Sequence, residues 1–141
     1  MNSVKVFSPA SVSNVCCGFD VLGFSIDGLG DELIITESDS KKVNIKKVNG
    51  YKVPLAVEEN TASVAAQSLL DFLNINHGFD IEINKIIKPG SGIGSSAASA
   101  VGAVYGINKL LGSPLKKHEL LKFAMQGEFI SSKTASADNI D

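Results

Sequence analysis

The stretch that decides how this chain is organised reads Pro89-Gly90-Ser91-Gly92-Ile93-Gly94-Ser95-Ser96-Ala97-Ala98-Ser99. An apolar, β-branched segment, residues 79–87, precedes it and predicts a strand. An alanine-rich segment with helical spacing, residues 94–111, follows it. A strand, a glycine loop and a helix N-terminus in this order bind phosphate, because glycines admit an anion close to the backbone and the first helical N–H groups have no partner within the helix.

The sequence motifs of other phosphate-binding glycine loops match this stretch poorly. A Walker loop requires a lysine beside its second glycine, and no lysine lies between Pro89 and Asn108. A dinucleotide fingerprint requires a third glycine at a position that Ser95 or Ala97 occupies, depending on where the count begins. A plain glycine turn capped by serine is the alternative, but three alternating glycines, a serine pair and a small-residue helix together favour a phosphate site.

The composition is that of an ordinary globular domain. The chain has 141 residues, of which 44% are hydrophobic and 20% are charged, and its net charge of −2 leaves no electrostatic footprint for nucleic acid or an anionic membrane. No apolar run approaches the roughly 20 residues of a membrane span. The adjacent Cys16 and Cys17 predict a reducing, cytoplasmic setting. Because no helix-stop or tail pattern precedes Asp141, we expect a fragment of a larger protein.

The hydrophobic pattern predicts a two-layer α+β domain with a mixed or antiparallel sheet and helices on one face. We expect a break in the first strand at residues 8–11, and a helix that Asn60 caps. We expect residues 38–42 to form a hairpin turn, and Ile86 to point inward from its strand. The predicted strands are residues 4–7, 31–37, 43–48 and 79–87, and the later helices are residues 94–111 and 115–129.

Five side chains outside the loop backbone are candidates for chemistry. Ser96 and Glu128 offer the hard oxygen ligands that Mg²⁺ prefers, although a carboxylate at a helix end is commonly only solvated. Asn14 and Asp20 flank a tight turn, where a carboxylate would hold an ammonium group or would simply cap the turn. Asn139 has the same two interpretations.

The pattern Pro-x-x-x-Gly-Ile-Gly-Ser-Ser-Ala-Ala resembles the phosphate loop of the GHMP small-molecule kinases, named for their galactose, homoserine, mevalonate and phosphomevalonate members. Two further stretches are similar to the homoserine kinases of that family. They are the opening of the chain through Gly18-Phe19-Asp20-Val21-Leu22-Gly23, and Gly127-Glu128 followed by Ala137-Asp138-Asn139. The three motifs occur in the family's order, and the resemblance covers nearly the whole chain.

This resemblance implies that residues 1–141 form the N-terminal ATP-binding domain of a GHMP kinase, a fold that also occurs in ribosomal proteins. The implied reaction transfers the γ-phosphate of ATP to the hydroxyl of L-homoserine and gives O-phospho-L-homoserine, on the route to threonine. By the family pattern, residues 89–99 hold the ATP phosphates, Ser96 and Glu128 lie near Mg²⁺, and Asn60 lies near adenine.

The resemblance also implies a substrate pocket made by Asn14, Asp20 and Asn139. Asp20 pairs with the substrate ammonium group, and Asn139 stands where mevalonate-type relatives have an aspartate base. Catalysis, assigned to Asn139, Ser96 and Glu128, then depends on positioning and charge neutralisation rather than on a strong protein base. The implied partner is a small molecule, not nucleic acid or a membrane, and a homodimer is compatible with the pattern.

Two departures from the family keep alternatives open. Ser136 stands where homoserine kinases usually have a histidine, so a GHMP kinase with another acceptor is one alternative. The family enzymes are roughly twice as long as this chain, as two ordinary domains would be. We therefore expect the C-terminal domain to be absent and the fragment alone to be inactive. A non-catalytic domain of the same fold is a further alternative, although the RNA-binding examples need a basic face that this chain lacks.

Overall fold

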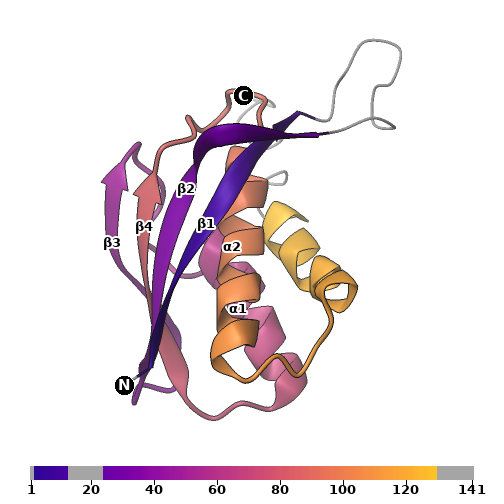
Figure 1. Cartoon of the computed structure of the whole chain (residues 1–141). Coiled ribbons are helices and arrows are strands. Elements are labelled where there is room, and N and C mark those ends of the chain that lie inside the picture. Colours follow the sequence, from indigo (N-terminus) through magenta and orange to yellow (C-terminus); the bar gives the residue numbers. More distant parts are fainter. Residues whose placement is uncertain (1, 13–23, 130–141) are drawn as a thin grey trace.

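The computed structural model describes residues 2–12 and 24–129 and has two layers, a four-stranded sheet and a layer of helices on one of its faces (Figure 1). This confirms the predicted α+β class. No helix within these residues has the length and apolar character needed to cross a membrane. The elements in chain order are β1 (Ser3–Val12), β2 (Phe24–Ser38), β3 (Val43–Gly50), α1 (Thr61–Leu73), β4 (Gly78–Lys85), α2 (Ser95–Leu110), a 3₁₀ turn η2 (Lys117–Leu120) and a helix over 121–129.

The sheet is mixed, with the order β1-β2-β4-β3. β4 runs antiparallel to β2 and parallel to β3, so it separates two strands that are neighbours in the sequence. The predicted hairpin at residues 38–42 is therefore wrong. The physical reason is burial: β4 carries Phe79, Ile81 and Ile83 and takes a central position, whereas β3 carries the exposed Lys46 and Lys47 and suits an edge.

The predicted break at residues 8–11 is also wrong, because β1 continues through Pro9. β1 is an edge strand, where a residue without an N–H group is tolerated, and its register against β2 shifts between Pro9 and Ser11. Gly30 lies opposite Pro9, and a Cβ atom at Gly30 would lie 2.5 Å from the Ser8 carbonyl oxygen. Only glycine allows the two strands to approach so closely here.

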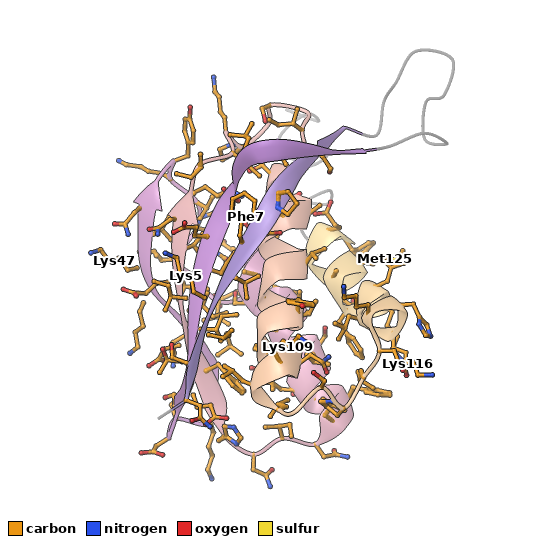
Figure 2. All side chains as sticks on the ribbon, in the orientation of Figure 1. Lys5, Phe7, Lys47, Lys109, Lys116 and Met125 are labelled. Atoms are coloured by element: carbon orange, nitrogen blue, oxygen red, sulfur yellow. The ribbon has the colours of Figure 1, made fainter. Side chains whose placement is uncertain are left out.

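The core lies between the sheet and the helices. Alternate residues of β2 and β4 point inward, whereas Lys5 and Lys47 lie on the face of the sheet away from the helices (Figure 2). Glycines on α2 allow it to lie close to the sheet, since a Cβ at Gly102 would lie 2.8 Å from Leu33 Cδ1. The inward side chains include those of Leu33, Ile35, Phe79, Ile81 and Ile83, which pack against Ala65, Leu69, Ala103, Val104 and Ile107 of the helices.

The predictions for the end of β4 and for the start of the last helix are also wrong. Ile86 is 51% exposed, not inward, because β4 ends at Lys85 and the chain turns; Ile87 is buried instead. The helix predicted over residues 115–129 begins as the 3₁₀ turn η2, and regular helix follows only from residue 121.

Ile81→Ala should lower the free energy of unfolding by about 2–5 kcal/mol, because its side chain is fully buried in the central strand and its removal leaves a cavity. Ile86→Ala is the matched control and should change this free energy by less than about 0.5 kcal/mol. Urea or guanidinium unfolding followed by circular dichroism measures both. Equal losses for the two variants would contradict the described core.

Candidate functional site

The loop between β4 and α2 has the backbone of an anion site. Gly90, Gly92 and Gly94 have φ angles of 78°, 82° and 77°, in the left-handed region that side chains disfavour. Gly94 is the N-cap of α2 and has no side chain to make a capping hydrogen bond. The first amides of α2, and the partial positive charge of the helix dipole, therefore remain available to an anion.

This loop faces an open cavity. A Cβ atom added at Gly90 or Gly92 would meet no atom of the described residues within 4 Å. The cavity has a volume of about 740 Å³ and brings the loop opposite the segment that leads into α1. Its lining residues are Lys52, Val53, Pro54, Glu59, Asn60, Thr61, Lys85, Pro89, Gly90, Gly92, Gly94, Ser95, Ser96 and Ser99.

The structure divides the predicted loop residues into those that line the cavity and those that support it. Ile93 and Ala98 pack with Ala10 and Ile87 in a small apolar cluster behind the loop. The Ile93 carbonyl oxygen also accepts a hydrogen bond from the Ser11 amide at 3.0 Å. These residues, like Ser91 and Ala97, do not line the cavity.

Asn60 lines the cavity, but its side chain already has partners. Its Oδ1 accepts hydrogen bonds from the amides of Ala62 (2.9 Å) and Ser63 (3.4 Å), and its Nδ2 donates to the Pro54 carbonyl oxygen (2.7 Å). The residue is 3% exposed. This confirms the predicted N-cap, and a contact with adenine stays a prediction.

Ser96 and Glu128 belong to two segments that both pack against the start of α1. Thr61 at the start of α1 donates from Oγ1 to the Ser96 carbonyl oxygen at 3.4 Å. Gly127 lies so close to the Thr61 carbonyl oxygen that a Cβ would overlap with it. The neighbouring Glu128 has a buried Oε1 with no hydrogen-bond partner among the described residues. A buried acceptor without a partner is unusual and indicates a ligand or another group that completes it.

Two site residues were not identified from the sequence. Lys85 lines the cavity, and its Nζ lies 2.5 Å from Asp31 Oδ2, with both side chains buried. Burial lowers the pKa of the Lys85 ammonium, although the hydrogen bond and charge of Asp31 and the charge of Glu128 act in the opposite direction. A signal existed, because the alternation that buries Ile81 and Ile83 also places Lys85 on the inward face.

Three predicted substrate residues lie outside the described residues. They are Asn14, Asp20 and Asn139, and their place in a pocket stays a prediction. Among the residues that the structure does describe, no three or more histidine, cysteine or acidic side chains gather as a metal site. A metal held here by Ser96 and Glu128 would therefore need further oxygen ligands from a bound molecule or from water.

Comparison with known protein families identifies the family of this chain. The sequence profile described as "GHMP kinases N terminal domain" matches residues 60–140, more than half of the chain. The chain belongs to the GHMP kinases. The predicted family is thereby confirmed, and the phosphate loop and Glu128 both lie within the matched residues.

Relatives within this family are named homoserine kinases. One from Xanthomonas campestris is 40% identical over 99% of this chain and 44% of its own length, and one from Chlorobium phaeovibrioides is 42% identical over 99% and 47%. The chain thus spans about half the length of the curated relatives it matches. The crystal structure of homoserine kinase from Cytophaga hutchinsonii matches with a TM-score of 0.90 and 47% identity, over 94% of this chain and 43% of that one.

More distant kinases share the fold alone. A mevalonate kinase from Methanococcus jannaschii matches with a TM-score of 0.64 at 22% identity, over 92% of this chain and 47% of that one. This likeness shows that the two-layer fold also occurs in a kinase whose name states a different acceptor.

Asn60→Ala should lower the free energy of unfolding by about 1–2 kcal/mol, because two amides of α1 lose their cap and the Pro54 carbonyl loses its donor. Asn49→Ala, which removes an exposed side-chain hydrogen bond to Asn84, is the control and should cost less than about 0.5 kcal/mol. Chemical unfolding monitored by circular dichroism compares the two. An Asn60→Ala variant as stable as the parent would remove the N-cap role.

Proposed function

We propose that this chain is the ATP-binding part of a cytoplasmic homoserine kinase, which transfers the γ-phosphate of ATP to the hydroxyl of L-homoserine and gives O-phospho-L-homoserine for threonine synthesis. The observation that carries this proposal is the uncapped N-terminus of α2, preceded by three left-handed glycines that face a cavity. The names of the relatives support the choice of acceptor.

The backbone of the loop would bind the phosphates. Gly90 and Gly92 leave open space beside their Cα atoms. The first N–H groups of α2 point out of the N-terminal end of the helix, which is the end that follows this loop. Ser95 is not available as a donor, because its hydroxyl already donates to the Ile87 carbonyl oxygen at 3.0 Å. The phosphate contacts therefore fall to main-chain N–H groups and to Ser96, while Asn60 and the start of α1 would face the nucleoside.

Ser96 and Glu128 suit a magnesium ion. Both offer hard oxygen ligands, and Glu128 has a buried oxygen with no hydrogen-bond partner among the described residues. When bound, the ion supplies neutralisation of the charge on the phosphate oxygens. The role of this chain's own residues would be to fix the oxygens that hold it and to orient the terminal phosphate toward the acceptor.

The acceptor pocket is proposed from three residues. Asp20 would pair with the substrate ammonium group, and Asn14 would help to line the pocket. Asn139 would orient the acceptor hydroxyl, since an amide is too weak a base to remove its proton in advance. Reaction then depends on holding the hydroxyl in line with the terminal phosphate.

A second candidate is a GHMP kinase with a different acceptor, favoured by Ser136 at the position where homoserine kinases usually have histidine. A non-catalytic domain is less well supported, because the Ser95-Ser96 pair and Glu128 are intact. The two kinase candidates share the nucleotide site and differ only in the pocket.

The acceptor is tested by coupled ADP release from the complete gene product that carries these residues, with homoserine, mevalonate, galactose or no acceptor. We expect turnover with homoserine only, because Asp20 would select an ammonium group. Turnover only with another acceptor would favour the second candidate, and no acceptor-dependent turnover at all would end the kinase proposal.

Ser96→Ala and Glu128→Gln should each reduce kcat by about 10²-fold or more, because each removes an oxygen that would hold magnesium at the phosphates. Ser68→Ala and Glu58→Gln are matched controls that do not line the cavity and should retain the parent rate. The same coupled assay, run over a range of Mg²⁺ concentrations, measures all four variants. Normal rates for both site variants would remove these residues from the site.

A further inference from the structure

Lys85 and Asp31 form a charged pair at the base of the glycine loop. They lie one step beyond the last paired residues of β4 and β2, Asn84 and Glu32, on the inward face of the sheet. Their side chains are 1% and 0% exposed. A pair of charges this deeply buried is expensive to desolvate, and an apolar pair is often at least as stable, so stability alone does not explain its presence.

Among the described residues, the remaining side-chain hydrogen bonds of this pair are made to the loop or to the first turns of α2. Lys85 Nζ donates to the Ser95 carbonyl oxygen at 2.5 Å and to Ser99 Oγ at 2.9 Å. Asp31 Oδ1 accepts from the amides of Ile86 (2.7 Å) and Ile87 (2.9 Å). One carboxylate thus fixes the chain as it leaves β4, and the ammonium group that it binds fixes the chain as it enters α2.

Between these two fixed ends, the loop has little other support on its open side. An added Cβ at Gly90 or Gly92 has no atom of the described residues within 4 Å, and residues 88–92 are exposed. Packing on the open side therefore does not set the direction of their amides. Behind the loop, the Ser11 amide holds the Ile93 carbonyl oxygen, and Ser95 Oγ joins the two loop ends through the Ile87 carbonyl oxygen. Asp31 and Lys85 are the charged groups that fix the same two ends.

The charges of Asp31 and Lys85 also cancel at the base of the glycine loop. An ionised carboxylate alone at the base of an anion site would repel phosphate at short range, and in a buried setting this repulsion is poorly screened. Lys85 neutralises Asp31 while it lines the cavity wall. The pair can thus organise the loop without opposing the anion.

We propose that Asp31 and Lys85 are a positioning pair that sets the phosphate-binding conformation of residues 88–95, and that they act through the loop ends. This inference deepens the proposed function and rests on it, since it assigns no new ligand. It predicts that the pair affects phosphate binding beyond its effect on folding.

The test separates these two effects with three variants. Lys85→Met leaves the Asp31 carboxylate buried without its partner and should lower the unfolding midpoint strongly. Asp31→Asn with Lys85→Met removes the stranded charge, keeps an acceptor for the amides of Ile86 and Ile87, and should recover most of that midpoint. Lys5→Met is the control, because it removes the exposed ion pair with Glu32, whose side chains are 63% and 38% exposed.

Calorimetric titration with Mg·ATP and with adenosine, on the complete gene product, gives the decisive comparison. The double variant should bind Mg·ATP about tenfold or more weakly than the parent although its midpoint is recovered, because the end of the loop at α2 is no longer fixed by Lys85. Its adenosine affinity and the Lys5→Met affinities should match the parent. A double variant that recovers both midpoint and Mg·ATP affinity would show a merely structural pair and overturn the proposal.

Amide hydrogen exchange without nucleotide distinguishes failure of this inference from failure of the proposed function. If the parent binds no Mg·ATP, the proposed function fails. Amide hydrogen exchange then still tests whether Asp31 and Lys85 position the loop, because it needs no nucleotide. The first-turn amide of Ala98, which donates to the Gly94 carbonyl oxygen at 2.9 Å, should exchange faster in the double variant than in the parent or in Lys5→Met. Unchanged exchange there would contradict the proposal.

Discussion

Asp31 and Lys85 form a buried charged pair on the inward face of the sheet, beside the place where β4 ends and the chain leaves toward α2. Burial requires that each of their polar atoms has a partner, and the loop ends and the first turns of α2 supply those partners. The glycine loop is consequently fixed by hydrogen bonds at its two ends and exposed to the cavity between them. In our proposal, the phosphate-binding conformation of the loop depends on this arrangement.

The helix layer completes the site because it packs so closely. Glycines at Gly102 and Gly106 let α2 approach the sheet, and Gly127 lets the final helix approach the start of α1. Each contact is short enough to exclude a methyl group. This spacing brings Glu128 toward Lys85 and the loop, and the charge of Glu128 acts on the pKa of that lysine. A carboxylate far away in the sequence thus acts on the lysine at the base of the loop.

Sequence reasoning found the loop because its function depends on local backbone freedom, which glycines at residues 90, 92 and 94 reveal directly. It also found the helix cap at Asn60, which depends on one side chain and two nearby amides. It did not find Asp31 and Lys85. The alternation of β4 places Lys85 on the inward face, but nothing within either strand indicates the partner of the buried charge. Their pairing exists only once β4 lies beside β2, and a predicted hairpin had placed β3 there instead.

The sequence by itself determined the two-layer class, the strand–loop–helix unit and membership of the GHMP kinases, because these follow from periodicity, glycine placement and a long motif. The tertiary structure alone decided the strand order, the partners of Lys85 and the approach of Glu128. Long-range pairing depends on which strand buries the most apolar surface, and that is a property of the whole sheet. Residues that are close in the sequence therefore form the glycine loop, and residues that are distant in the sequence fix its conformation.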